Sequence, residues 1–272
     1  MQLKKSEIRD LPHYTEGPAM DDRGNIYCTT LTGGEIKMID AQNNITTWGS
    51  SECPNGQAIL SNGDHLVCDS ALGSIRRFDC NGRFLRDEIH GMCAGVKVDV
   101  PNDVVVDQQE GFYFTDSIRY DGKVFYKSAD GRETLVINGL DYPNGLALSQ
   151  DQKTLYIAES YKNRIIRISI NAPGISNGEY SVLADLPVHQ SGNAFSNLPD
   201  GLAIDDKGFL WVAHYGMNAV HVIDPLRALV KTFDIVFPLV SNVFISKNCQ
   251  LIVTGGYGEP GPGAIAIFTV KY

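Results

Sequence analysis

Six polar residues recur in the same local context, each just before an apolar stretch, and all six carry side-chain oxygen atoms. They are Glu16, Asn55, Asn102, Asn144, Asp200 and Asn242. Four of them directly follow a proline. Carboxylate and amide oxygens are the ligands that hard divalent cations prefer, and Ca2+ takes about six to eight oxygens. If the six residues meet in space, they could hold such a cation, and the two carboxylates would balance its charge.

A second interpretation of these residues needs no ligand. Asparagine and aspartate next to glycine are common in turns, and Asn55-Gly56, Asn144-Gly145 and Asp200-Gly201 fit that pattern. Each pair alone is explained equally well by a turn. An oxygen-bearing residue in all six copies favours a shared site, because a polar group at the edge of a buried strand is costly unless it has a partner.

The six residues belong to an internal repeat. Residues 198–214 read as a Pro-Asp-Gly turn, an apolar strand, a polar turn and a second apolar strand, and the other copies follow the same order. The six polar residues are spaced by 39, 47, 42, 56 and 42 positions. A period of about forty residues with about four strands per unit is typical of propeller blades. We therefore predict an all-β fold, a six-bladed β-propeller with four antiparallel strands per blade, as a single domain over residues 1–272.

The repeat also predicts where these residues lie. The first strand of each blade lines the central tunnel of a propeller, so the six side chains are expected to converge on one axis. The C-terminal strand, residues 263–271, leaves the last blade one strand short. We expect residues 2–9 to supply the outermost strand and close the ring, which removes the exposed sheet edges. A longer connection is expected over 171–197, and another over 86–100 is expected to overhang one mouth of the tunnel.

Composition excludes several classes of function. The net charge of −9 argues against nucleic acid or an anionic membrane surface as a partner. No apolar run approaches the ~20 residues that span a bilayer, and no apolar stretch follows Lys4 and Lys5 to make a signal peptide. The six cysteines lack zinc-like spacing, and Cys28 and Cys68 are expected to be buried free thiols. We expect a reduced, cytoplasmic protein that is a monomer or a small homo-oligomer.

Several motifs resemble one known family over nearly the whole chain. They are Glu16-Gly-Pro, Pro101-Asn-Asp-Val-Val-Val-Asp, Phe114-Thr-Asp, Tyr142-Pro-Asn-Gly-Leu-Ala-Leu-Ser, Glu159-Ser-Tyr-Lys-Asn-Arg-Ile and Pro199-Asp-Gly-Leu-Ala-Ile-Asp. The chain resembles the family of regucalcin (SMP-30), the gluconolactonases and the luciferin-regenerating enzyme. The resemblance implies one divalent metal ion in the tunnel, bound directly by Glu16, Asn144 and Asp200. It implies that Asn102 joins the metal shell or contacts the substrate. Ca2+ is the expected ion, with Mn2+, Mg2+ or Zn2+ as alternatives.

The same resemblance implies a hydrolase that opens a lactone ring. The metal ion would polarise the lactone carbonyl, and Asp200 would be both a ligand and the general base. Asp103 and Asp116 are alternative proton acceptors, since a carboxylate on a cation is a weak base. We expect substrate contacts from Asn102, Asp116 and His214.

Two other functions remain open at this stage. The same site could serve a phosphotriesterase-like hydrolase, or the propeller could be a non-catalytic binding platform with a structural calcium ion. The sugar lactonases of the family carry an arginine two residues before the asparagine, where this chain has Val100. The identity of the lactone therefore stays open.

Overall fold

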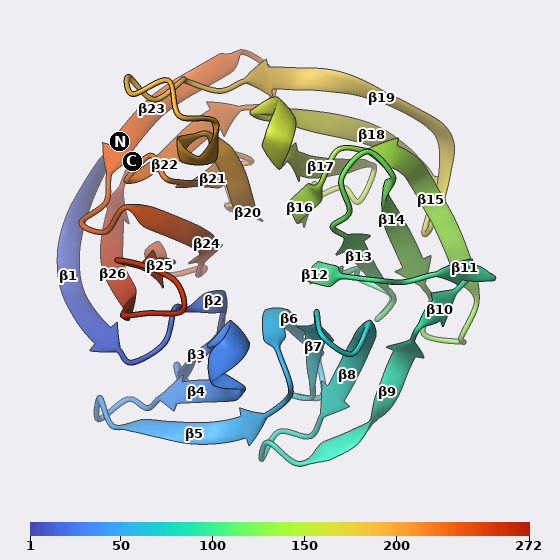
Figure 1. The fold of residues 1–272 in the computed structure, drawn as a ribbon, viewed down its shortest axis with the longest axis horizontal. Coiled ribbons are helices and arrows are strands. Elements are labelled where there is room, and N and C mark those ends of the chain that lie inside the picture. The colour runs from blue at the N-terminus through green and yellow to red at the C-terminus, as the bar shows by residue number, and fades with distance from the viewer.

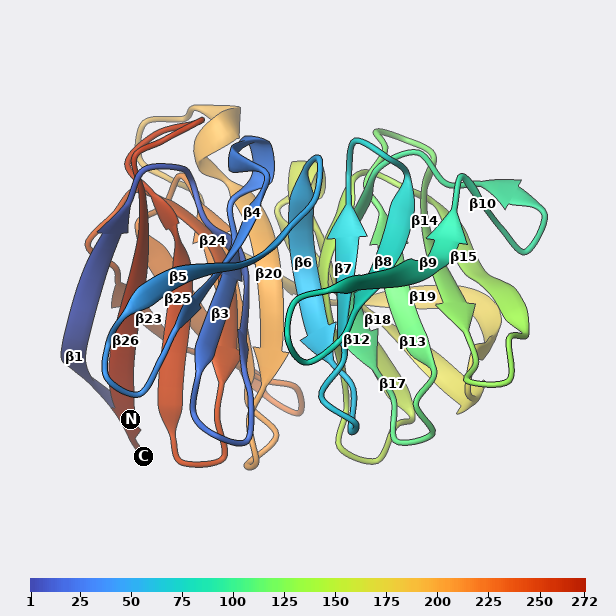
Figure 2. The ribbon, with the colours of Figure 1, turned by 90° about the horizontal axis from the view of Figure 1, so that it is seen from below.

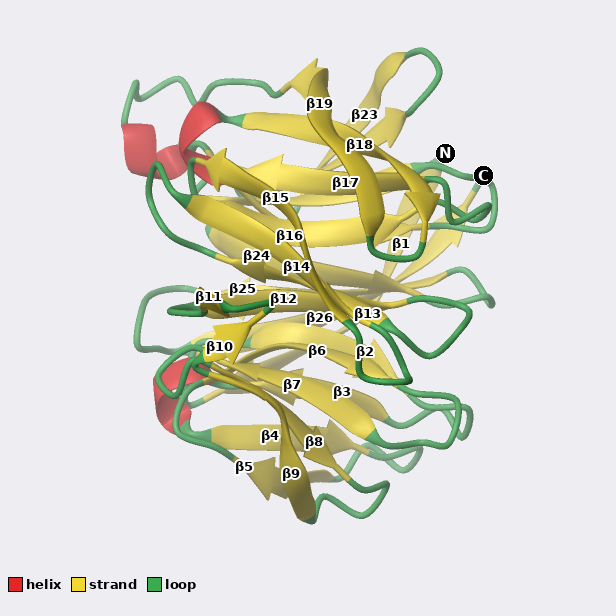
Figure 3. Cartoon of the chain, turned by 90° about the vertical axis from the view of Figure 1, so that its right-hand side faces the viewer, coloured by secondary structure: helices red, strands yellow, loops and turns green.

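The protein folds into a ring of β-sheets around a central tunnel (Figure 1). The computed structural model describes the backbone of residues 1–272 and the side chains of all residues except Ala194, Ala228, Leu229 and Val230. The helices of the described backbone are three short 3-10 turns, η1 (Leu31–Gly33), η2 (Ser160–Lys162) and η3 (Ala194–Ser196). All three lie at the same end of the ring (Figure 3). No described helix is long and apolar enough to cross a membrane.

Six four-stranded blades make up the ring, which confirms the predicted all-β propeller. Blade one comprises β2 (Glu16–Met20), β3 (Ile26–Thr29), β4 (Glu35–Ile39) and β5 (Ile45–Ser50). Blade two comprises β6 (Pro54–Ile59), β7 (His65–Asp69), β8 (Ser74–Phe78) and β9 (Phe84–His90). Blade three comprises β12 (Pro101–Val106), β13 (Phe112–Asp116), β14 (Gly122–Lys127) and β15 (Glu133–Leu140). Blade four comprises β16 (Pro143–Leu148), β17 (Thr154–Glu159), β18 (Arg164–Ala172) and β19 (Ile175–Asp185).

Blades five and six complete the ring. Blade five comprises β20 (Leu198–Ile204), β21 (Leu210–Tyr215), β22 (Ala219–Asp224) and β23 (Ala228–Asp234). Blade six comprises β24 (Leu239–Ile245), β25 (Gln250–Gly256), β26 (Gly263–Lys271) and, from the other end of the chain, β1 (Gln2–Leu11). The pairing of β1 with β26 runs from Gln2 opposite Lys271 to Leu11 opposite Gly263. The predicted closure by the N-terminal strand is therefore confirmed, and the two termini lie side by side (Figure 1).

The two long connections are partly ordered as strands. Residues 86–100 contain the small hairpin of β10 (Met92–Cys93) and β11 (Val96–Lys97). In blade four, β18 and β19 extend past the expected strands and pair with each other, for example Ala172 with Ile175. The connection expected over 171–197 is thus strand in its first half, because the pairing of β18 with β19 continues to the end of this hairpin. Only the part after Asp185 runs over the mouth, and it carries η3.

The hydrophobic core is divided among the interfaces between neighbouring blades. Trp211 and Val220 of blade five, for example, pack against Val240 and Leu251 of blade six. Equivalent clusters join the other pairs of neighbours. A fully buried aliphatic or aromatic side chain contributes about 1.5–3 kcal/mol, so each interface stabilises the ring substantially. The inner strands β2, β6, β12, β16, β20 and β24 are thereby fixed around one axis (Figure 1). The side view shows that inner strands such as β6 and β20 run along this axis (Figure 2).

Candidate functional site

A cavity of about 380 Å³ opens at the end of the tunnel that carries the three helical turns. Its fourteen lining residues are Tyr14, Glu16, Leu31, Asn55, Asn102, Tyr142, Asn144, Ser160, Tyr161, Phe195, Leu198, Asp200, Tyr215 and Glu259. The structure thus brings together five of the six polar residues of the repeat. Their side chains are almost fully buried, with Glu16 and Asp200 exposed by only 6% and 7%.

Strand register explains why these residues reach the axis. In blades two to five the proline before the polar residue pairs with the last residues of the second strand, as Pro143 does with Glu159. The carboxylate at that strand end accepts backbone N–H groups from the segment before the proline. Asp116 accepts from Asp99 and Val100 at 3.1 and 2.6 Å, and Glu159 accepts from Asp141 at 2.9 Å. These bonds hold the starts of β12 and β16 in place.

Serine side chains orient two of the asparagines, Asn55 and Asn144. Ser160 Oγ donates to the carbonyl of Pro199 in the next blade at 2.7 Å, and Asn144 Nδ2 donates to the same hydroxyl at 3.3 Å. In blade two, Ser70 Oγ likewise donates to the carbonyl of Pro101 and accepts a hydrogen bond from Asn55 Nδ2. Because the amide nitrogen is held, the amide oxygen has to point elsewhere. Asn144 Oδ1 and Asn55 Oδ1 are buried without a hydrogen-bond partner among the described residues.

The charges in the cavity are unbalanced. Burial raises the pKa of Glu16 well above its usual value, and the nearby Asp103 carboxylate adds to the effect. Burial likewise raises the pKa of Asp200, with repulsion from Glu16 as the second cause. No lysine, arginine or histidine is among the described lining residues. Two buried carboxylates without a counter-charge are costly, so the site fits a cation.

The donor set fits a hard divalent cation. The described residues contain no group of three histidine, cysteine, aspartate or glutamate side chains that could hold a metal ion. The tunnel instead offers two carboxylates and the unpartnered oxygen of Asn144, with Asn102 beside them in the same lining. Oxygen donors without nitrogen or sulfur suit Ca2+ or Mg2+ better than zinc.

The sixth copy of the repeat departs from the expected alignment. The hairpin pair Ile245–Leu251 in blade six is equivalent to the pair Ile204–Leu210 in blade five. Ser241 precedes Ile245 by as many residues as Asp200 precedes Ile204, so Ser241 is the equivalent of Asp200 and Asn242 lies one residue further along the strand. Ser241 Oγ donates to Thr15 O at 2.7 Å. Asn242 therefore belongs to the next layer of the tunnel and does not line the mouth cavity. The sequence alignment was off by one position, because blade six has Ser241-Asn242 where the other copies have a polar residue and then, usually, glycine.

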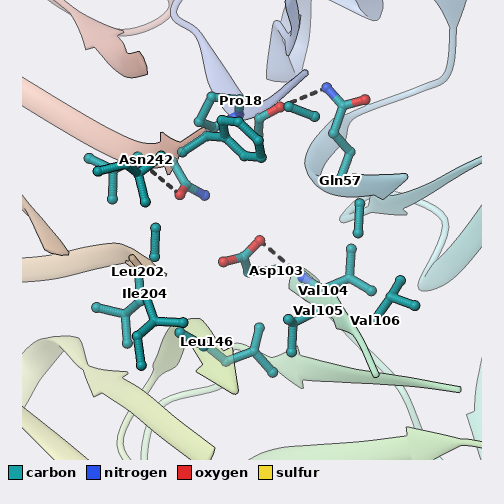
Figure 4. Close-up of a pocket in the computed structure, with 18 of the residues that line it drawn as sticks. Pro18, Gln57, Asp103, Val104, Val105, Val106, Leu146, Leu202, Ile204 and Asn242 are labelled. Carbon is teal, nitrogen blue, oxygen red and sulfur yellow. Dashed lines mark hydrogen bonds between the residues drawn. The ribbon is translucent and has the colours of Figure 1, made fainter. Parts of the chain in front are cut away.

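That next layer closes the tunnel directly below the mouth cavity. Its six positions are Gly17, Gly56, Asp103, Gly145, Gly201 and Asn242. The glycines leave room for two side chains: a Cβ on Gly56 would lie 2.6 Å from Asp103 Cα. Below this layer a second, mainly apolar cavity of about 340 Å³ runs to the other mouth, with Asp103 and Asn242 at its inner end (Figure 4). Burial raises the pKa of Asp103 to about 7.

Two residues expected to contact substrate lie elsewhere. Asp116 is fully buried at the strand-end position described above, and His214 occupies the same position in blade five, paired with Pro199. His214 Nδ1 lies 2.8 Å from His221 Nε2. Neither residue is among those that line the mouth cavity. Their placement supports a role in fixing the inner strands.

Sequence reasoning missed the upper wall of the cavity. Tyr14, Tyr142 and Leu198 all stand two residues before a polar residue of the repeat, so the repeat alignment itself carried this signal. Tyr215 follows the strand-end position of blade five directly. Glu259 comes from the loop between β25 and β26, and no pattern in the sequence indicates that this loop lies over the axis.

The fold and the cavity define a six-bladed propeller with an oxygen-lined site on its axis, open at one mouth. Residues 14–255 match the SMP-30/gluconolactonase/LRE-like region. The chain belongs to this family, which confirms the resemblance drawn from its motifs.

Individual relatives support the same conclusion. Lactonase drp35 of Staphylococcus saprophyticus is 31% identical over 275 residues, which cover 94% of this chain and 82% of that protein. A gluconolactonase structure from Xanthomonas campestris has a TM-score of 0.81 at 23% identity and covers 95% of this chain and 86% of its own. A calcium-binding regucalcin from Agrobacterium tumefaciens has a TM-score of 0.79 at 17% identity, with coverage of 96% and 93%. At these identities the two structures support the fold alone.

Proposed function

We propose that this protein is a divalent-metal-dependent hydrolase that opens a lactone ring in the mouth cavity. The observation that carries the proposal is the pairing of two buried carboxylates, Glu16 and Asp200, with the unpartnered oxygen of Asn144 on the tunnel axis. The similarity to a lactonase over nearly the whole chain supports the choice of reaction.

Glu16, Asn144 and Asp200 would hold the cation, and Asn102 would join them or bind the substrate. Ca2+ is the ion that these oxygen donors suit best, and the calcium-binding regucalcin has the same fold. When bound, a divalent cation supplies Lewis-acid polarisation of the lactone carbonyl.

Side chains of the protein supply the proton acceptor and the hydrogen bonds to the substrate. Asp200 accepts the proton of the attacking water, and Asp103, on the axis directly below, is the alternative acceptor. Asn102 orients the substrate. The hydroxyl of Tyr14 is buried without a partner among the described residues, so it is free to donate a hydrogen bond to the carbonyl oxygen as negative charge develops there.

The open mouth favours an enzyme over a binding platform with a structural ion. A structural site is closed by protein ligands, whereas a catalytic one keeps room for substrate. Here the ligand oxygens form the floor of a cavity that opens among aromatic side chains. A phosphotriesterase would use the same floor, so only a substrate panel separates the two reactions.

The direct test is proton release on a panel of lactones and one fluorophosphonate, before chelation, after it, and after each divalent ion is restored. We expect lactone opening that vanishes with chelator and returns with one ion. Asp200→Asn should reduce turnover by at least about a hundredfold, as expected for loss of general base catalysis. Activity that survives exhaustive chelation, or a fully active Asp200→Asn enzyme, would contradict the proposal.

A further inference from the structure

Aromatic side chains dominate the upper wall of the mouth cavity. Tyr14 and Tyr215 meet edge to face with ring centroids 6.3 Å apart, and Tyr142 and Tyr161 do so at 5.4 Å. Phe195 from η3 adds a ring that is 63% exposed at the rim. A substrate that enters above the ligand oxygens therefore passes between tyrosine rings. The negative faces of such rings attract organic cations.

A third carboxylate, Glu259, stands at the same mouth. Its loop is held over the axis by backbone hydrogen bonds, Tyr14 N to Pro260 O at 2.9 Å and Tyr257 N to Pro262 O at 2.9 Å. Burial raises the pKa of the neighbouring Tyr215, and the Glu259 carboxylate is the next cause. Its charge therefore acts on the tyrosine-lined part of the cavity.

Glu259 is exposed at the rim, and no basic side chain among the described lining residues balances its charge. The lining holds Glu16, Asp200 and Glu259 and, among its described members, no basic residue. A divalent cation offsets the first two and leaves one negative charge at the mouth. Two basic side chains near the mouth are engaged elsewhere: Arg119 covers Tyr161 at 3.6 Å but is bound to Asp141 at 2.6 Å. Lys162 is paired with Glu159 at 3.1 Å.

We propose that the substrate of this pocket is a lactone with a cationic alkylammonium substituent, which Glu259 and the tyrosine rings recognise. This inference rests on the proposed lactonase function and names the substrate class within it. The carboxylate attracts the ammonium group and the rings surround its methyl groups, while an anionic substituent is repelled. The absence of a described arginine or lysine in the lining disfavours lactones of sugar acids that carry a free carboxylate or phosphate.

The test uses three γ-butyrolactones that differ only in one substituent: trimethylammonium, its neutral isostere tert-butyl, and carboxylate. We expect kcat/KM for the ammonium lactone to exceed that for the tert-butyl lactone by about tenfold, with the carboxylate lowest. Glu259→Gln and Tyr215→Leu should each reduce the ratio several-fold. Glu179→Gln, a matched change at an exposed glutamate on β19, should leave it unchanged.

A binding measurement separates this inference from the proposed reaction. Phenyltrimethylammonium and its neutral isostere tert-butylbenzene are titrated into the metal-loaded protein by calorimetry. Tighter binding of the cation, weakened by Glu259→Gln, supports the inference even if no lactone is opened, in which case only the reaction is refuted. Equal hydrolysis of all three lactones, or equal binding of both probes, overturns the inference while the lactonase proposal stands.

Discussion

At the scale of single residues, the floor of the cavity combines two buried carboxylates with asparagine amide oxygens. No basic side chain is among the described lining residues. The amides of Asn55 and Asn144 are each oriented from behind by a serine that also bridges to the next blade. The serine therefore couples the position of a metal-facing oxygen to the packing of two blades. The same arrangement in blades two and four indicates that it is a property of the repeat.

Ser160→Ala tests this coupling. The change removes the donor to Pro199 O and the acceptor for Asn144 Nδ2, and it leaves buried polar groups without partners. We expect a loss of about 1–3 kcal/mol in the free energy of unfolding, measured in urea, and a several-fold loss in Ca2+ affinity because Asn144 is no longer held. Ser6→Ala on the exposed strand β1 is the control and should change neither quantity appreciably. Unchanged Ca2+ affinity in Ser160→Ala would show that the serine does not orient the ligand.

At the scale of elements, the inner strands approach one another closely just below the site. The glycine that follows the polar residue permits this approach in four blades. At Gly145 an added Cβ would lie 2.5 Å from Gly201 Cα and 2.6 Å from Leu202 N, both backbone atoms of the neighbouring inner strand. Backbone contacts of this kind cannot be relieved by a change of rotamer.

Gly145→Ala should therefore separate β16 from β20 and displace Asp200. We expect a loss of about 1–3 kcal/mol in stability from overpacking, together with loss of Ca2+ binding, measured by thermal unfolding with and without the ion. Gly49→Ala is the control, because its Cβ would meet its nearest neighbours at 3.4 Å or more. If Gly145→Ala binds Ca2+ like the unchanged protein, the close approach of these strands does not determine the site.

At the scale of the whole molecule, closure of the ring depends on the pairing of β1 with β26, which joins the two ends of the chain. The interior of the ring also holds histidines in their neutral form. His65 is 1% exposed, packs against Tyr27 and Trp48, and bonds through Nδ1 to Gln57 at 2.9 Å. Burial lowers the pKa of His65 from 6.5 to about 4, and burial lowers the pKa of His221 similarly, to about 4.

These histidines make stability depend on pH. Between pH 6.5 and about 4 the unfolded chain binds a proton that the folded protein does not, so the free energy of unfolding falls as the pH falls through this window. Above pH 6.5 the contribution of the neutral form is fully retained. Each such group contributes at most ~1.4 kcal/mol per pH unit. Urea unfolding at pH 7.5, 6 and 5 should show a shallower pH dependence for His65→Gln than for the unchanged protein, and equal slopes would contradict this assignment.

The sequence predicted the propeller and five of its axial residues because a repeat forces equivalent positions onto one axis. It failed where the repeat is broken. Ser241-Asn242 shifted the sixth copy by one residue. Asp116 and His214 were expected at the substrate, although the repeat aligns them with Asp69 and Glu159 at a strand end that pairs with the proline. The position of Glu259 could not be predicted from the sequence, because the loop that carries it has no counterpart in the other blades. Backbone hydrogen bonds that involve Tyr14 and Pro262 place this loop.

The most direct test of the account is a calorimetric titration of Ca2+ into the metal-free protein and into Glu16→Gln. We expect one site per chain in the unchanged protein. We also expect a loss of at least about tenfold in affinity when one of the two charges that balance the ion is removed. Absence of binding to the unchanged protein, or equal affinity in Glu16→Gln, would mean that the axial oxygens are turn residues and not a metal site.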